Sequence, residues 1–153
     1  MYSDNHLVKR AKVNELSRDY GRFAGHVLTP MLMLKHNIQA RVYISKHFPE
    51  RLVDRDFYRH EDRKFMFKLL SYVFEKKPDD LFEDQDVFVR YKDLTVMLFS
   101  EFRDDWRQIR LNTFFGKNEN TFMNEKQGRK LKILDVDIND MMNYSPTIIR
   151  GTA

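Results

Sequence analysis

The chain has 153 residues, a formal net charge of +4 and 42% hydrophobic residues, among them 13 Phe and 7 Tyr. This composition supports one folded domain with a sizeable core and argues against wholesale disorder. The absence of cysteine excludes a disulfide framework and any cysteine-based zinc site. The first residues lack an apolar signal-peptide core and no apolar stretch is long enough to span a bilayer, so we expect a cytoplasmic protein.

The N-terminal segment, residues 1–39, is expected to be helical. Residues 4–19 suit a polar helix in which Asp4 is a candidate cap. Residues 26–36 are expected to be partly helical around Pro30, which removes one backbone donor. No residue of this segment indicates a particular chemistry.

An α+β core is expected over residues 40–136. Residues 40–45 alternate in polarity and carry β-forming side chains, which predicts a strand. Ser45 is a candidate cap for a helix that runs to about Arg55. A second helix is predicted over residues 61–76, where apolar residues recur every three or four positions.

Strands are expected to fill the second half of the chain. After an acidic loop at residues 75–86, a β-hairpin is predicted from residues 87–91 and 94–100, followed by a strand over residues 107–115. A polar connector is then expected over residues 117–129 and a short strand over residues 131–136. The C-terminal tail covers residues 137–153, and its end, residues 143–153, is expected to be mobile. Because sequential strands with short connections pair antiparallel, we expect N-terminal helices on one face of a small antiparallel sheet.

Positive charge is distributed unevenly along the chain. The loop at residues 75–86 is acidic, so the remainder is more basic than the net charge suggests. A positive field attracts polyanions such as RNA, although basic faces also occur on proteins with no nucleic-acid role. RNA is therefore the expected partner.

A cationic stripe is predicted on the first core helix, in the segment SKHFPERLVDR. His47, Arg51 and Arg55 recur every four positions, while Phe48 and Leu52 occupy a neighbouring stripe suited to anchoring the helix in the core. Histidine serves as acid or base near neutral pH, and arginine binds phosphate through two donors. These groups suit RNA cleavage without a metal, in which the ribose 2′-hydroxyl attacks the adjacent phosphorus.

The same helix has a second interpretation. Glu50, Asp54 and Asp56 lie beside the cationic stripe and are candidates to pair with it. Exposed pairs of this kind stabilise by only about 0–1 kcal/mol. The spacing would then describe a solvated helix face.

Residues 44–72, ISKHFPERLVDRDFYRHEDRKFMFKLLSY, resemble the phage RegB endoribonucleases, which belong to the wider RelE/ParE-like toxin fold. The similarity continues more loosely through YKDLTVMLF and WRQIRLNTFF, and covers about residues 40–115. It implies a metal-independent endoribonuclease that cuts mRNA and shuts off translation of particular phage or host messages. It also implies that His47 is catalytic and that Arg51 supports the phosphate.

The chain departs from this family at the second catalytic histidine. Ser71 stands at the best-matching position on the following helix, and a serine hydroxyl is no acid or base at neutral pH. His60, at the start of that helix, is a candidate substitute about three turns away. The departure leaves a second possibility open: a non-catalytic module of the same fold that binds RNA or a host protein.

Four residues outside the first core helix are further candidates for RNA binding: Arg90, Trp106, Arg107 and Arg110. On the predicted third strand, Arg110 shares one face with Gln108 and Asn112, while Ile109 and Leu111 share the other. A polar strand face with an arginine suits phosphate or base edges, and an outward polar face explains it equally well. Trp106 is a candidate to stack on a base, with edge packing as its alternative.

The remaining partner predictions follow from absent motifs and from the resemblance. The sequence shows no zinc spacing, EF-hand or Gly-rich phosphate loop, so we expect neither a metal nor a cofactor. Besides mRNA, a ribosome or ribosomal protein and a neutralising antitoxin are the partners considered, and no membrane contact is expected.

Overall fold

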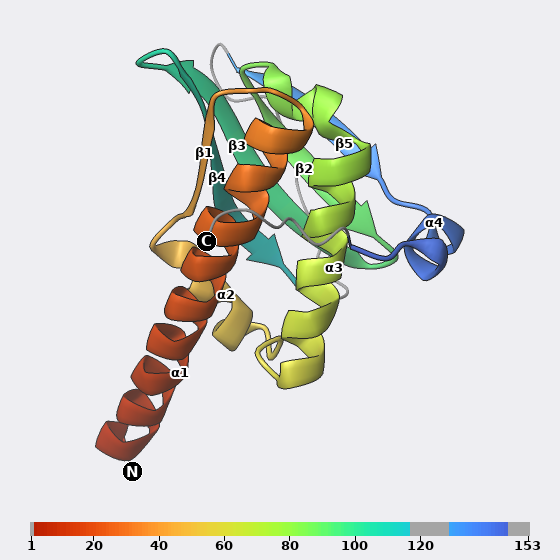
Figure 1. Ribbon diagram of the computed structural model, residues 1–153. Helices are drawn as coiled ribbons and strands as arrows, with labels where there is room; N and C mark the ends of the chain where they lie inside the picture. Colours follow the sequence, from red (N-terminus) through yellow and green to blue (C-terminus); the bar gives the residue numbers. More distant parts are fainter. Residues whose placement is uncertain (1, 117–128, 147–153) are drawn as a thin grey trace.

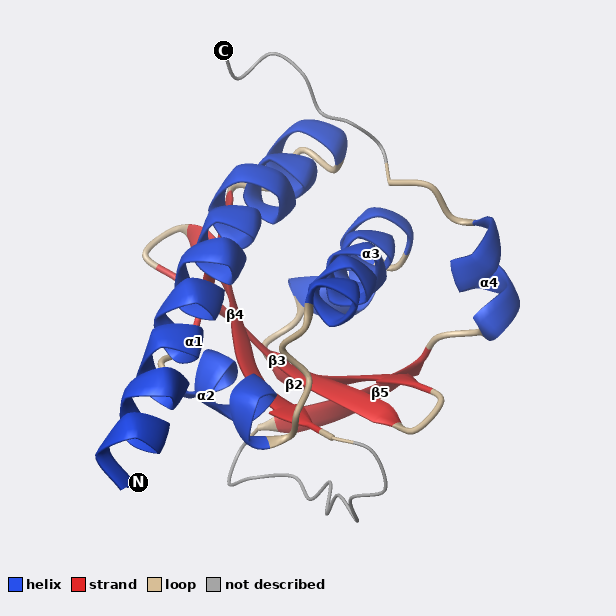
Figure 2. Cartoon of the chain, turned by 90° about the horizontal axis from the view of Figure 1, so that it is seen from below, coloured by secondary structure: helices blue, strands red, loops and turns tan. Residues whose placement is uncertain are grey.

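Helices cover one face of a five-stranded mixed sheet, so the fold is α+β, as the sequence predicts (Figure 2). The structure is a computed structural model and describes residues 2–116 and 129–146. Most of the predicted polar connector and the end of the predicted tail therefore lie outside the described residues. Among the described helices, none has the length and apolar character needed to cross a membrane.

The helical elements are shown along the chain in Figure 1. They are α1 (Tyr2–Phe23), the π-helical segments η1 (Ala24–Leu28) and η2 (Met31–Lys35), α2 (His47–Asp54), α3 (His60–Lys76), the 3-10 helix η3 (Pro78–Phe82) and α4 (Ile138–Asn143). The two helices predicted in the core correspond closely to α2 and α3. In contrast, α1 is longer than the predicted span of residues 4–19.

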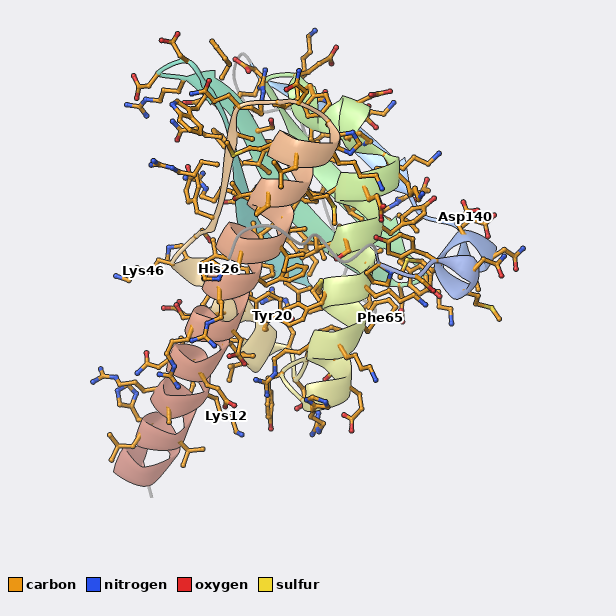
Figure 3. The ribbon with its side chains drawn as sticks, viewed as in Figure 1. Lys12, Tyr20, His26, Lys46, Phe65 and Asp140 are labelled. Atoms are coloured by element: carbon orange, nitrogen blue, oxygen red, sulfur yellow. The ribbon has the colours of Figure 1, made fainter. Side chains whose placement is uncertain are left out.

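The greater length of α1 follows from burial of its C-terminal half. Leu16 and Tyr20 are fully buried, and the Tyr20 ring meets Phe48 of α2 and Phe67 of α3 edge-on, at centroid distances of 5.2 and 5.0 Å. Figure 3 shows Tyr20 between α1 and α3. Tertiary packing of this kind outweighs the low helix propensity of Gly21.

The sheet has the strand order β1-β4-β3-β2-β5. Its strands are β1 (Ala40–Ile44), β2 (Gln85–Tyr91), β3 (Leu94–Arg103), β4 (Trp106–Phe115) and β5 (Lys130–Asp135). β2, β3 and β4 form the expected antiparallel meander. The turn between β3 and β4 uses Asp104 and Asp105 at φ values of 55° and 66°, a conformation that aspartate tolerates.

The prediction of a wholly antiparallel sheet is wrong at both edges. β1 pairs parallel with β4, and β5 pairs parallel with β2. The chain leaves β1 through α2 and α3 before it returns to the sheet, and a long crossover of this kind is what parallel pairing requires. β5 lies beside β2, at the edge of the meander opposite the one that β1 occupies.

The C-terminal segment is anchored up to Tyr144, whereas the sequence predicted a mobile end from residue 143. Met141 of α4 and Tyr144 are buried, at 3% and 7% exposure. The Tyr144 hydroxyl donates to the Glu75 carboxylate of α3, and the Tyr72 hydroxyl donates to Asp140 over 3.2 Å. These contacts hold the segment against the C-terminal end of α3.

Candidate functional site

The position of α2 is fixed by its first turn and by its apolar face. The Ser45 hydroxyl accepts from the Phe48 amide over 3.1 Å and donates to the Asn112 carbonyl of β4 over 2.5 Å. Phe48 and Leu52 are completely buried, which confirms the predicted anchoring stripe. The opposite face of α2 is therefore held outward on a rigid support.

His47 is an exposed residue at the start of α2. Its Nδ1 atom lies 3.4 Å from Oε2 of Glu50, and 67% of its side chain is accessible to solvent. No other hydrogen bond or ion pair of the His47 ring is formed with the described residues. A carboxylate at Nδ1 favours the tautomer with the proton on that atom, which leaves the lone pair of the ring on Nε2.

Arg51 lies one turn along α2 and shares a carboxylate with α1. Oδ2 of Asp54 is 3.6 Å from Nη1 of Arg51, and Oδ1 of Asp54 is 2.5 Å from Nζ of Lys9. The prediction that acidic residues pair with the stripe is thus confirmed for this arginine. Asp54 also brings a lysine of the N-terminal helix to the same surface, which the sequence did not indicate.

A groove of about 370 Å³ runs along α1 beside Glu50. Its lining from α1 consists of His6, Lys9, Arg10, Val13 and Asn14. α1 and α2 lie side by side in Figures 1 and 2. Positive side chains on α1 recur at helical spacing, but only the tertiary structure places them next to α2.

The predicted three-residue stripe is divided between two places. Arg55 follows the end of α2, two turns or about 12 Å along the axis from His47. It lines a separate pocket of about 440 Å³ with Arg59, Asp62 and Gly116 among its neighbours. His47 and Arg51 therefore share a surface with α1, whereas Arg55 belongs to the other end of the helix.

His60 and Ser71 are not placed beside His47. His60 is exposed at the start of α3, beyond the end of α2 that is remote from His47. Ser71 is 2% exposed within α3, among the residues of the core. The described contacts bring neither side chain to the His47 ring.

Two of the predicted RNA-binding arginines form ion pairs with carboxylates inside the fold. Arg90 makes a two-point contact with Asp135, through Nε at 2.8 Å and Nη2 at 3.2 Å. The side chain of Arg107 is only 11% exposed and donates to Asp84 over 2.7 Å and to the Phe82 carbonyl over 2.8 Å. Both contacts join neighbouring segments of the fold.

These arginines affect the pKa values of Asp84 and Asp135. Burial raises the pKa of Asp84, but hydrogen bonds from the Phe102 amide and Arg107 outweigh it and leave that pKa below its ordinary value. The hydrogen bond from Arg90 likewise lowers the pKa of Asp135. Both carboxylates are therefore ionised near neutral pH.

Arg110 lies on the sheet face opposite the helices. Strand pairing aligns it with Phe99 on β3 and Tyr43 on β1. Its guanidinium lies 4.5 Å from the centroid of Phe99, and that of Arg129 lies 3.9 Å from the same ring. In Figure 2, no helix of the described chain covers this face. Two cations and an aromatic ring thus gather there.

The other strand-face predictions have mixed outcomes. Ile109 and Leu111 are completely buried while Gln108, Arg110 and Asn112 remain partly exposed, so the predicted alternation along β4 is confirmed. Trp106 starts β4 and is partly exposed. Within residues 2–116 and 129–146, no three acidic or histidine side chains gather as metal ligands would.

Comparisons with protein-family models, with curated proteins and with solved structures find no match for this chain.

Proposed function

We propose that this protein is a metal-independent endoribonuclease that uses His47 as its general base. The observation that carries the proposal is the contact between Glu50 and Nδ1 of His47, on an exposed helix face one turn from Arg51. A carboxylate that orients an imidazole in this way is a recurrent means of preparing a base. The guanidinium of Arg51 adds a fixed positive charge for the phosphate.

In the proposed reaction, Nε2 of His47 removes the proton of a ribose 2′-hydroxyl. The 2′-oxygen forms a bond to the adjacent phosphorus, and the bond from phosphorus to the 5′-oxygen breaks. The leaving oxygen takes up a proton, so the products carry a 2′,3′-cyclic phosphate and a 5′-hydroxyl. Arg51 and Lys9 stabilise the charge that develops on the phosphate oxygens.

The ion pairs of Asp54 are compatible with phosphate binding. The paired side chains of Lys9 and Asp54 are 48% and 35% exposed, and that of Arg51 is 45% exposed. Exposed pairs contribute only about 0–1 kcal/mol, so a phosphate can replace the carboxylate at little cost. Lys9 and Arg51 are therefore both able to bind an RNA phosphate.

The biological setting is part of the proposal. The likeness of residues 44–72 to RegB-type enzymes points to mRNA as substrate and to control of translation in the cytoplasm, in the host if the gene belongs to a phage. A ribosomal protein is the partner that would direct the enzyme to messages.

The test is incubation of the purified protein with mRNA in EDTA. We expect fragments that end in 2′,3′-cyclic phosphate, and loss of cleavage in His47→Ala. His26→Gln, which alters an exposed histidine on η1, is the matched control and should cleave as the wild type does. Equal cleavage by His47→Ala and the wild type would remove His47 from the mechanism.

A second candidate function is non-catalytic binding of single-stranded RNA by the sheet face that carries Arg110. The specific observation is the placement of the Arg110 and Arg129 guanidinium groups over Phe99. Aromatic rings with nearby cations bind unpaired bases and phosphates with little dependence on sequence. This function predicts salt-sensitive RNA binding without cleavage, whereas binding that is indifferent to salt would indicate a protein partner.

A further inference from the structure

The proposed reaction needs a proton donor that His47 does not supply. The base takes a proton from the 2′-hydroxyl while a separate acid protonates the leaving 5′-oxygen. Ser71 is buried in the core, and His60 lies beyond the remote end of α2. The groove between α1 and α2 is where another titratable group can reach the same phosphate.

Glu50 connects that groove to His47. Its carboxylate lies 3.4 Å from the His47 ring, and the same residue lines the groove with His6. His6 on α1 thus shares this groove with the residue whose carboxylate contacts His47 on α2. The sequence separates His6 from His47 by 41 positions, so no local pattern reveals this arrangement.

The position of His6 on α1 is set by contacts further along that helix. Lys9, one turn later, pairs with Asp54 of α2, and Leu16 and Tyr20 fix the helix in the core. His6 itself is exposed. It therefore remains accessible to a ligand.

The charge and size of the groove suit an RNA phosphodiester. Lys9 and Arg10 line it, and Arg51 adjoins it through Asp54. Its volume of about 370 Å³ falls in the range of small-ligand sites, roughly 300–1,000 Å³.

We propose that His6 is the general acid of this ribonuclease and acts on the same phosphodiester as His47. This inference rests on the proposed function. The protonated His6 ring gives its proton to the 5′-oxygen as the phosphorus–oxygen bond breaks, while Nε2 of His47 receives the proton of the 2′-hydroxyl. Lys9 binds a non-bridging phosphate oxygen between the two rings.

The test uses two single-stranded RNA substrates of one sequence in EDTA. One has the normal 5′-oxygen at the cleaved bond, and the other has sulfur in its place. A thiolate leaves without protonation, so the sulfur substrate does not need a general acid. The wild type, His6→Gln, His47→Gln and the control His26→Gln are compared under single-turnover conditions.

We expect His6→Gln to cleave the oxygen substrate about 10²–10⁴-fold more slowly than the wild type, the usual contribution of a general acid. On the sulfur substrate its defect should fall to less than about tenfold, whereas His47→Gln should remain defective on both.

Two results would overturn the assignment of His6 and leave His47 in place. One is His6→Gln cleaving the oxygen substrate at the wild-type rate. The other is an equal defect of His6→Gln on both substrates, which would indicate a structural role. If neither substrate is cleaved by the wild type, the ribonuclease proposal itself fails, and this assignment fails with it.

Discussion

The hydroxyl of Tyr144 donates a 2.5 Å hydrogen bond to Oε1 of Glu75, a residue 69 positions earlier in the chain. Glu75 is 3% exposed, and the ammonium group of Lys35 binds its other carboxylate oxygen. Segments before β1 and after β5 therefore meet at one buried carboxylate of α3. The stability of the fold should be sensitive to this point.

Tyr144→Phe is expected to lower the free energy of unfolding by about 1–3 kcal/mol, because it withdraws a hydrogen bond from a buried carboxylate. Urea unfolding measures the change. Tyr58→Phe is the matched control, since its hydroxyl makes no hydrogen bond with the described residues, and should change stability by less than about 0.5 kcal/mol. Equal stability of Tyr144→Phe and the wild type would show that the hydrogen bond contributes nothing.

Tyr20→Phe is expected to behave in the opposite way. The Tyr20 hydroxyl is buried without a hydrogen-bond partner in the part of the chain that the structure describes, and burial raises its pKa so that it stays protonated. Removing an unsatisfied buried hydroxyl keeps the ring packing and recovers the desolvation cost. Stability should be unchanged or higher by up to about 1 kcal/mol. A clear loss in urea unfolding would reveal a partner for this hydroxyl.

The contact between Asp84 and Arg107 predicts a dependence of stability on pH. Because the folded pKa of Asp84 lies below the ordinary value of 3.8, ionised Asp84 stabilises the fold above that pH. The contribution is lost as pH falls from 3.8 through the lower folded pKa. Asp84→Asn should therefore be less stable than the wild type at pH 7, and the difference should shrink in acid.

Urea unfolding of both proteins at pH 7 and near pH 3 measures that difference. Asparagine keeps an oxygen for the Phe102 amide, so the comparison isolates the charge next to Arg107. A difference that stays constant between the two pH values would mean that the charge of Asp84 does not stabilise the fold.

RNA binding by the sheet face that carries Arg110 predicts distinct effects of two substitutions. Phe99→Ala should weaken binding of single-stranded RNA by about 1–3 kcal/mol through lost stacking. Arg110→Ala should reduce the slope of log affinity against log salt by about one through a lost phosphate contact. Fluorescence anisotropy at several salt concentrations measures both. Arg18→Ala, an exposed arginine on α1, is the control, and equal effects of all three would argue against a defined surface.

Local spacing predicted the parts of the fold that depend on neighbours in sequence. Burial of Phe48 and Leu52 and the alternation around Arg110 both follow from residues two to four positions apart. The pairing of Arg51 with Asp54 was predictable for the same reason. A helix or strand presents such side chains together whatever the rest of the chain does.

Contacts between distant segments were not predictable from that spacing. The parallel strand pairs at both sheet edges depend on which edge is still open when a strand arrives. The approach of His6 and Lys9 to α2 depends on how α1 crosses the core. Arg107 shows how this affects the prediction of a site. As a basic residue on a strand it suggested RNA binding, whereas in the structure its guanidinium donates to Asp84 and to a backbone carbonyl.

The parallel pairing of β5 with β2 has a consequence for synthesis of the chain. The β2–β3–β4 meander emerges first, and the outer edge of β2 keeps unpaired backbone groups until residues 130–135 follow. Val87 and Val89 make that strand strongly apolar. A nascent chain that stops before β5 would therefore expose β2 as an unpaired, apolar edge strand. Such truncated products are expected to aggregate.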